Sequence, residues 1–303
     1  MNNKGFLLVL STAVISGFSI FINKFGVSVA NPYIFAGLKN LLVAIFLTSL
    51  VLILKDLPTL KKLTKKQWSL LVTIGLVGGS VPFLLFFKGL TMISAPEGSF
   101  LQKTMFVFVG LLAVWTLKEK LEKKFIVAAL LLLAGNALLL KNFHLTFGVG
   151  SLLVLGATVL WAVENVLSKY MLRDLSWRIV AWARMFFGSA FIFIFLAFTG
   201  QVSLIATIGT KQWSWTLVTA VLLIGYVSTW YSGLKHIEVS KATAILLLGS
   251  PITTVLSLIA GGSISVREIG ATFLILVGIA VIVGFKNILL TLKKVKLSNY
   301  ART

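Results

Sequence analysis

The sequence predicts an all-α polytopic membrane protein with ten transmembrane helices, arranged as two inverted five-helix repeats. Of its 303 residues, 58% are hydrophobic and only 12% are charged, whereas about 25% of the residues in soluble globular domains are charged. The apolar residues form continuous runs rather than alternating patterns, which excludes a transmembrane β-barrel. In addition, the tetrapeptide KQWS occurs at residues 66–69 and again at 211–214, which indicates an internal repeat.

Ten apolar runs each approach the ~20 residues that a helix needs to cross the hydrocarbon core of a bilayer. In chain order they cover residues 6–23, 33–54, 69–90, 97–117, 125–140, 149–171, 177–198, 213–234, 240–260 and 268–285. The first run resembles a signal peptide, but it is long enough to span and has a counterpart later in the chain, so we interpret it as the first helix. The intervals are too short for a soluble domain, which excludes an enzyme on a single-pass anchor.

The basic residues predict the orientation of the chain. Five lysines lie at 55–66, four at 118–124 and five basic residues at 286–302, and ten spans place these three segments on one side. The opposite loops are poorer in Lys and Arg, so both termini are expected to be cytoplasmic and the protein to lie in the cell membrane. Because the basic residues separate apolar runs, the net charge of +20 does not indicate nucleic-acid binding.

Several classes of chemistry are excluded or disfavoured by composition. The chain has no cysteine and two histidines, His144 and His236, which are far apart in the sequence. Thiol catalysis and Cys-ligated metals are therefore impossible, and neither a His-based metal site nor a cofactor is expected. Paired catalytic carboxylates are also lacking, so an intramembrane enzyme is the least favoured class.

The KQWS match defines an offset of 145 residues that aligns other positions. Lys24 then aligns with Lys169, and Lys39 with Arg184; with a one-residue gap, KGL at 88–90 aligns with SGL at 232–234. These matches predict a first repeat at 1–142, a second at 143–288 and a basic cytoplasmic tail at 289–303. An odd number of spans in each half inverts the second half, as in secondary transporters, whose substrate site lies between the repeats.

Motifs in both halves carry a family resemblance. Trp161 and Lys169 lie in LWAVENVLSK, Arg184 and Lys39 occupy equivalent positions in the next helices, Glu119 lies in LKEKL, and Pro251 lies in SPITTVLSLIAGG. Together they resemble EamA-type members of the drug/metabolite transporter superfamily, over essentially all of residues 5–286. Three positions depart from that pattern, namely Ser16, Val107 and Gly262 or Ser263. The resemblance implies a transporter of small metabolites that works by alternating access.

We therefore expect a secondary transporter, not an enzyme, that exports a small polar or amphipathic metabolite such as an amino acid. Proton coupling through Glu164 and facilitated diffusion are both open. A flippase for lipid-linked intermediates is an alternative, and it would need a lateral opening lined by basic residues. A membrane partner protein without transport activity is a second alternative, and it would have a filled centre. The expected partners are the substrate, the bilayer and, with coupling, protons.

One helix face carries the main candidate site. Trp161, Glu164, Asn165 and Ser168 recur at spacings of three and four residues, so they share a face. Polar residues also occupy the equivalent positions of the first helix, including Ser19 and Asn23. Polar stripes in membrane helices face the bundle interior or a wet cavity. Glu164 is thus a candidate for binding substrate or protons, and a structural interhelical hydrogen bond is the alternative.

The other candidate residues have weaker signals. Lys103, beside Gln102, is a candidate anchor for a carboxylate or phosphate, with snorkelling as the alternative. Tyr226, Trp230 and Thr243 lie on faces that could line the site, although ordinary packing explains aromatic residues equally well. Four charged residues near the membrane surfaces are candidate gates, with snorkelling or rim ion pairs as alternatives: Lys39, Arg184, Lys88 and Glu97.

Overall fold

The computed structural model describes residues 2–27, 31–93, 95–139, 148–261 and 265–284, and within these ranges all regular structure is helical. The first half contains α1 (Asn3–Val27), α2 (Pro32–Ile53), α3 (Leu57–Lys61), α4 (Lys65–Ile74), η1 (Gly75–Ser80), α5 (Val81–Leu90), α6 (Ala95–Lys103), α7 (Met105–Leu112), η2 (Ala113–Leu117) and α8 (Lys123–Leu138). The second half contains α9 (Val149–Met171), α10 (Trp177–Phe198), η3 (Val202–Thr207), α11 (Thr210–Leu234), α12 (Val239–Ile245), η4 (Leu246–Leu248), α13 (Gly249–Ile259) and α14 (Val266–Val283). The predicted tail at 289–303, Gly262, Ser263 and His144 lie outside the described residues.

Nine helical stretches of the described chain are long and apolar enough to cross a membrane, so the protein is a multi-pass membrane protein. The sequence predicts ten. The difference falls on the run at 125–140, where α8 has 16 residues and is about 24 Å long. That length is below the ~30 Å thickness of the hydrocarbon core, so a membrane-spanning role for α8 stays a prediction.

Local sequence signals explain several helix starts. Thr64 and Gln67 form a capping box at the start of α4, and Ser265 and Glu268 form another at the start of α14. Each box satisfies backbone N–H groups that have no partner in the first helical turn. The Asn31 side chain accepts hydrogen bonds from the first backbone N–H groups of α2.

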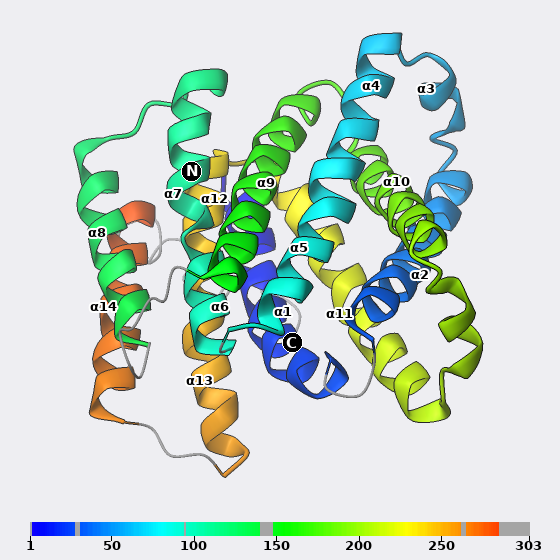
Figure 1. Cartoon of the computed structure of the whole chain (residues 1–303). Coiled ribbons are helices and arrows are strands. Elements are labelled where there is room, and N and C mark those ends of the chain that lie inside the picture. The colour runs from blue at the N-terminus through cyan, green and yellow to red at the C-terminus, as the bar shows by residue number, and fades with distance from the viewer. Residues whose placement is uncertain (1, 28–30, 94, 140–147, 262–264, 285–303) are drawn as a thin grey trace, which may run out of the picture.

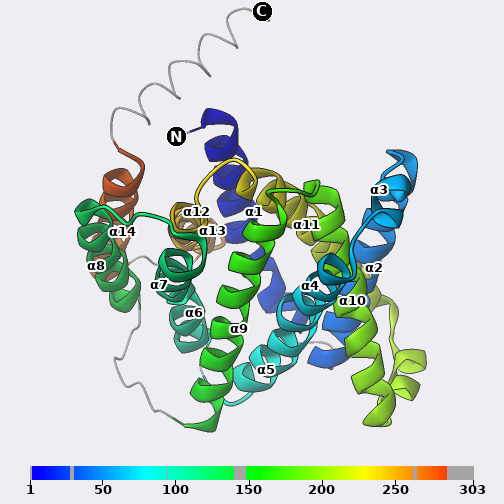
Figure 2. The same cartoon turned by 90° about the horizontal axis from the view of Figure 1, so that it is seen from above.

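The helices pack in a pattern that recurs in the two halves. The α2–α10 pair lies at one edge of the bundle and the α8–α14 pair at the opposite edge, in both Figure 1 and Figure 2. Between them, α1 packs against α11 and α13 of the other half, and α9 packs against α5, α6 and α7. Each half thus places its first helix against the third and fourth spans of the other half.

Glycine pairs show that the contact between α1 and α11 resembles the contact between α9 and α5 in detail. A Cβ added to Gly5 would lie 3.3 Å from the carbonyl oxygen of Gly233, and one added to Gly150 would lie 3.2 Å from that of Gly89. Gly5 and Gly150 are 145 residues apart in the sequence, and Gly89 and Gly233 are 144 apart. In each contact, only glycine leaves room for the two backbones to approach.

The fourth span of each half is interrupted at a corresponding place. In the first half α6 ends at Lys103 and α7 begins at Met105; in the second half the short 3₁₀ segment Leu246–Leu248 separates α12 from α13. Pro251 follows this segment, and because it has no N–H it cannot donate the usual i+4 helical hydrogen bond to the carbonyl of Leu247. Pro251 therefore lies directly after an irregular turn in the fourth span of the second half.

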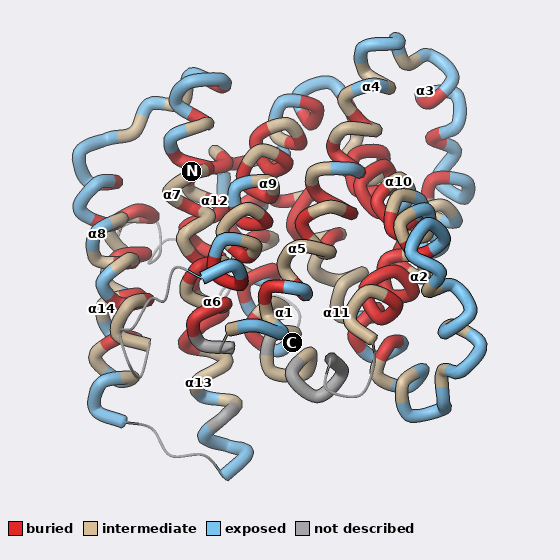
Figure 3. Tube along the Cα trace, in the orientation of Figure 1, coloured by how far each residue is buried: buried red, intermediate tan, exposed pale blue. Residues whose placement is uncertain are grey.

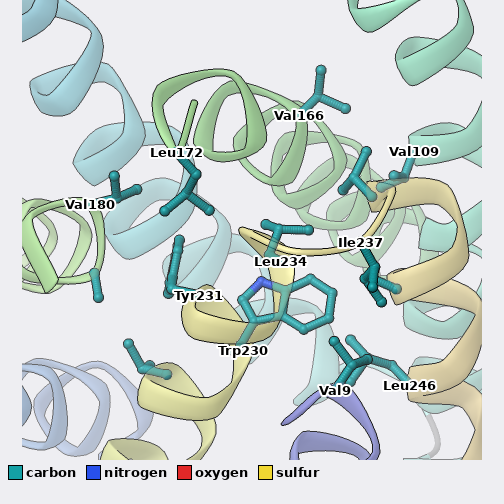
Figure 4. Packing of buried hydrophobic residues seen from close by; sticks show 14 of the residues in the cluster. Val9, Val109, Val166, Leu172, Val180, Trp230, Tyr231, Leu234, Ile237 and Leu246 are labelled. Carbon is teal, nitrogen blue, oxygen red and sulfur yellow. The ribbon is translucent and has the colours of Figure 1, made fainter. Parts of the chain in front are cut away.

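Burial is concentrated where the two halves meet, as Figure 3 shows along the inner faces of the helices. Trp230 and Tyr231 of α11 are the largest fully buried side chains among the described residues. Figure 4 shows the Trp230 indole among side chains from other elements, including Val9 of α1 and Leu246 of η4. These two aromatic residues also form part of the polar network of the candidate site.

Candidate functional site

A carbonyl oxygen in the third span is the centre of a polar network. Residues Gly75–Ser80 form a π-helical turn between α4 and α5, and such turns occur often at functional sites. Pro82 lies four residues after Gly78, so it has no N–H to donate to the Gly78 carbonyl. Two side chains of the other half donate to that oxygen instead: Trp161 Nε1 at 3.0 Å and an Arg184 guanidinium nitrogen at 3.3 Å.

Glu164 lies beside this turn and is completely buried. Its Oε1 accepts hydrogen bonds from the Ser168 hydroxyl at 2.6 Å and from the Tyr231 hydroxyl. Gly78 packs directly on the side chain, so that a Cβ at this glycine would overlap the Glu164 Cγ. A carboxylate in a membrane core needs such partners, and α11 and α9 itself supply them.

Arg184 of α10 faces the second oxygen of this carboxylate. Its Nε lies 3.9 Å from Glu164 Oε2, and among the described residues neither atom has a hydrogen-bond partner. The charges therefore attract each other, but the distance exceeds that of a hydrogen bond. A polar group of a substrate could bind to both atoms, so the pair is suited to binding a ligand as well as to joining helices.

Asn165 extends the network on the other side of α9. Its Oδ1 accepts a hydrogen bond from Trp230 Nε1 at 3.0 Å, and its Nδ2 donates to the Trp161 carbonyl at 2.8 Å. The same Nδ2 lies 3.6 Å from Met105 Sδ of α7. The Trp230 ring is stacked on Tyr226, with 6.4 Å between centroids. Asn165 thus connects α9 with α11 and α7.

Aromatic rings line the side of Trp161 that faces α5. The indole lies 5.5 Å from the ring of Phe83 and 5.3 Å from that of Phe86, measured between centroids. Phe87 contacts both of these rings and lies below the ammonium group of Lys39, 5.8 Å from its centroid. Apolar rings and hydrogen-bonding groups therefore lie close together, an arrangement that suits an amphipathic ligand.

Several predicted residues lie outside this network. Asn23 donates to Ser19 at 2.9 Å within α1, and Thr243 bonds to carbonyl oxygens of its own helix. Lys103 is buried, whereas Gln102 beside it is half-buried. In the described parts of the chain, none of these five residues forms a hydrogen bond or an ion pair with Glu164 or Arg184, and their roles stay predictions.

The two charged residues predicted as an outer gate differ in burial. Lys88 is exposed, while Glu97 is buried and accepts a hydrogen bond from the Ser151 hydroxyl at 2.7 Å. Arg184 and Lys39, predicted as a second pair of gates, are both buried. Arg184 is part of the Glu164 network, so its position favours a central role over a gate.

One end of the bundle is closed by bonds between the halves. Glu119 accepts hydrogen bonds from the Val239 N–H at 2.9 Å and from the Ser240 hydroxyl at 2.6 Å, and so caps α12. Arg178 of α10 forms a two-point ion pair with Asp56, with its second bond at 2.8 Å. This is the end that the lysine-rich loops predict to be cytoplasmic.

Sequence reasoning missed two parts of the network, Tyr231 and the Gly78 carbonyl. Tyr231 and the Gly78 carbonyl contact Glu164 and its partners only because distant helices meet. The sequence GLVGGS at residues 75–80 contains small residues that allow close helix packing, and Gly79 lies against Gly188 of α10. Pro82, four residues after Gly78, is the sequence signal that the Gly78 carbonyl lacks its usual helical donor and can accept hydrogen bonds from side chains. No group of three or more His, Asp or Glu residues in the described chain could hold a metal ion.

Comparison with known proteins decides the family. The sequence model of the EamA-like transporter family matches residues 3–141 and, separately, residues 148–284. The chain belongs to the EamA-like transporter family. A curated relative named riboflavin transporter ImpX, from Fusobacterium nucleatum, is 29% identical over 91% of this chain and 96% of its own length. The uncharacterized transporter YoaV of Bacillus subtilis is 25% identical over 80% of this chain and 84% of its own length.

A solved structure shares the fold of this EamA-family protein. A crystal structure of a protein with 17% sequence identity superposes with a TM-score of 0.74, over 93% of this chain and 98% of the other. Because the identity is low, this likeness concerns the fold alone. The family and the names of the relatives support a transporter role in a membrane.

Proposed function

We propose that this EamA-family protein is a secondary transporter that exports a small polar or amphipathic metabolite by alternating access. The observation that carries the proposal is the buried Glu164–Arg184 pair, which lies against the Gly78 carbonyl where the two halves meet. Intramembrane ionisable groups mark substrate or ion pathways. An amino acid fits this pair because it carries both charges, and Glu164 is also placed to carry a proton.

Two inverted repeats, at 1–142 and 143–288, are part of the proposal. Three observations support them: the two separate matches of the family model, the equivalent glycine contacts and the corresponding breaks in the fourth spans. Rocking of one repeat against the other would expose the Glu164 region to each side of the membrane in turn. The bonds of Glu119 and Arg178 would then hold the cytoplasmic side closed in the described conformation.

Riboflavin is a specific candidate substrate. The rings of Phe83, Phe86 and Trp161 form an apolar aromatic surface beside the polar network, and a planar, amphipathic molecule suits such a surface. A relative named as a riboflavin transporter covers nearly the whole chain. Riboflavin and amino acids are therefore both candidate substrates.

The test of function measures which metabolites enter membrane vesicles. Inverted vesicles that contain the wild type, Glu164→Gln or no added transporter are incubated with a cell extract supplemented with riboflavin, and their contents are analysed by mass spectrometry. Export predicts that at least one small amphipathic metabolite accumulates about tenfold or more in wild-type vesicles only. Equal contents in all three preparations would contradict transport, and accumulation only in right-side-out vesicles would contradict export.

The predicted orientation has its own test. The native chain has no cysteine, so a single introduced thiol reports its own accessibility. Ser203 in η3 and Lys120 in the loop before α8 are both exposed. In intact cells, Ser203→Cys should react with a membrane-impermeant maleimide, and Lys120→Cys should react only after permeabilisation. The reverse pattern would place the termini outside the cytoplasm.

The vesicle contents separate a transporter of soluble metabolites from both alternatives, and the leaflet distribution of a lipid-linked intermediate separates the alternatives from each other. A flippase would leave soluble metabolites unchanged and would instead move a lipid-linked intermediate between the leaflets. A partner protein without transport activity would change neither the soluble metabolites in the vesicles nor the distribution of the lipid-linked intermediate. The structure favours a soluble amphipathic ligand, because Glu164 and Arg184, the charged residues nearest the centre of the network, are buried within the bundle.

A further inference from the structure

Lys39 of α2 is a buried cation that forms no ion pair with an acidic side chain among the described residues. Only 5% of its surface is exposed. Its Nζ lies 5.0 Å from the ring centroid of Phe35 and 5.8 Å from that of Phe87. In the described ranges, no side chain or carbonyl forms an ion pair or a hydrogen bond with this ammonium group. Ring faces attract a cation, but they carry no net negative charge.

The second half shows what an equivalent cation has beside it. Arg184 is 145 residues after Lys39 and lies at the corresponding position of α10. The carboxylate of Glu164 provides the opposite charge, with 3.9 Å between its Oε2 and Arg184 Nε. The position that corresponds to Glu164 in the first half is Ser19, whose hydroxyl accepts a hydrogen bond from Asn23. The first half therefore contains a buried cation at this position without the acid that accompanies it in the second half.

We propose that the missing negative charge is supplied by the substrate: Lys39 binds a carboxylate or phosphate group of the transported molecule. A charged side chain inside a membrane protein is expected to pair with an opposite charge, and a bond between an ammonium group and an oxyanion is among the stronger hydrogen bonds. The rings of Phe35 and Phe87 would contact the apolar part of the same molecule. This inference rests on the proposed transport function and narrows its substrate class to amphipathic molecules that carry a carboxylate or phosphate group, which an amino acid has and riboflavin lacks.

The location of Lys39 fits an anion site on the exit path of an exporter. It lies two turns into α2, whose first residue Pro32 is at the end of the bundle opposite the lysine-rich loops. Lys103 is also buried, with 8% of its surface exposed. Its position corresponds to Leu248 in the second half, however, so comparison of the repeats says nothing about a missing partner there.

The test compares anionic and neutral molecules that share an aromatic ring. The pairs are riboflavin 5′-phosphate with riboflavin, and indole-3-acetate with indole-3-acetamide. Dissociation constants are measured by calorimetry on the purified protein in phosphatidylcholine nanodiscs, so that the lipid phosphate is constant. For at least one pair, the wild type should bind the anion about tenfold or more tightly than the neutral molecule, which corresponds to about 1.4 kcal/mol.

Three variants connect this preference to Lys39. Lys39→Gln should bind the anionic and the neutral molecule about equally, so the preference of about 1.4 kcal/mol is lost. Lys39→Arg should retain the preference for the anion. Lys211→Gln is the control, because it removes an exposed lysine at the end of the bundle where α2 begins. If the role of Lys39 were purely structural, Lys39→Gln would lower the thermal stability of the protein but would not change the ratio of the dissociation constants for the neutral and the anionic molecule. The inference is overturned if the wild type shows no anion preference in either pair, or if Lys39→Gln keeps it.

This outcome is separable from that of the transport experiment. Vesicle accumulation does not depend on the ratio of dissociation constants. If the protein transports a metabolite but does not prefer anions, only the proposed role of Lys39 is refuted. An anion preference that depends on Lys39, in a protein that moves nothing into vesicles, would instead leave a binding protein and remove the proposed function.

Discussion

Glu164→Gln is expected to abolish transport and to destabilise the protein more than any other conservative change in the network. The substitution leaves the buried Arg184 guanidinium without a counter-charge and replaces the acceptor of the Ser168 and Tyr231 hydroxyls. Removing one partner of a buried ion pair typically costs about 3–5 kcal/mol. The measurements are the free energy of unfolding in mixed micelles and the accumulation of the substrate in vesicles.

Two further variants make this result specific. Glu122 forms an exposed ion pair with Lys124, and Glu122→Gln should change neither the stability nor the transport, because such pairs contribute little. Glu164→Gln combined with Arg184→Gln should be less destabilised than the sum of the single variants, since no buried charge is left unpaired. Normal stability and normal flux in Glu164→Gln alone would show that the pair has neither role.

Gly78→Ala is expected to reduce transport by about tenfold or more, equivalent to about 1.4 kcal/mol. The added methyl group overlaps the Glu164 side chain, so the π-helical turn or the carboxylate must move. The Gly78 carbonyl would then lose its geometry with Trp161 and Arg184. Inserting a methyl group into a well-packed interior also costs about 1–3 kcal/mol of stability.

Gly156→Ala is the matched control for this change, because it adds the same methyl group to α9, the helix of Glu164. There the nearest atom to the new Cβ is Leu85 Cδ1, at 3.9 Å, which is an ordinary contact. Alanine is also about 1 kcal/mol more favourable than glycine within a helix. Gly156→Ala should therefore transport normally, and equal flux in the two glycine variants would contradict a special role for Gly78.

The sequence predicts the helical membrane class and the polar face of α9 because both depend on local patterns. Glu164 stands out as a carboxylate in an apolar run, and the helical period places Trp161 and Asn165 on the same face. Its partners are harder to predict. Tyr231 is 67 residues away in the chain, and nothing in its own surroundings indicates that its hydroxyl meets a carboxylate.

Charged residues near the helix ends were the hardest to assign. Lys88 and Glu97 are close in the sequence, but the fold exposes the first and buries the second against Ser151. Helix rotation decides such outcomes, and single-sequence patterns determine rotation poorly when both faces of a helix are apolar.

The fifth span illustrates another limit, because α8 ends at Leu138, and the apolar run alone does not determine where a helix ends.

The central claim is that the region around Glu164 opens alternately to the two sides of the membrane. Met105 is half-buried and its sulphur lies 3.6 Å from Asn165 Nδ2, so Met105→Cys places a thiol beside the site in a chain with no other cysteine. The measurement is the rate at which a membrane-impermeant methanethiosulfonate modifies this thiol in right-side-out and in inverted vesicles. Alternating access predicts modification from both sides, and saturating substrate should slow both rates. Modification from one side only, or from neither, would contradict the mechanism.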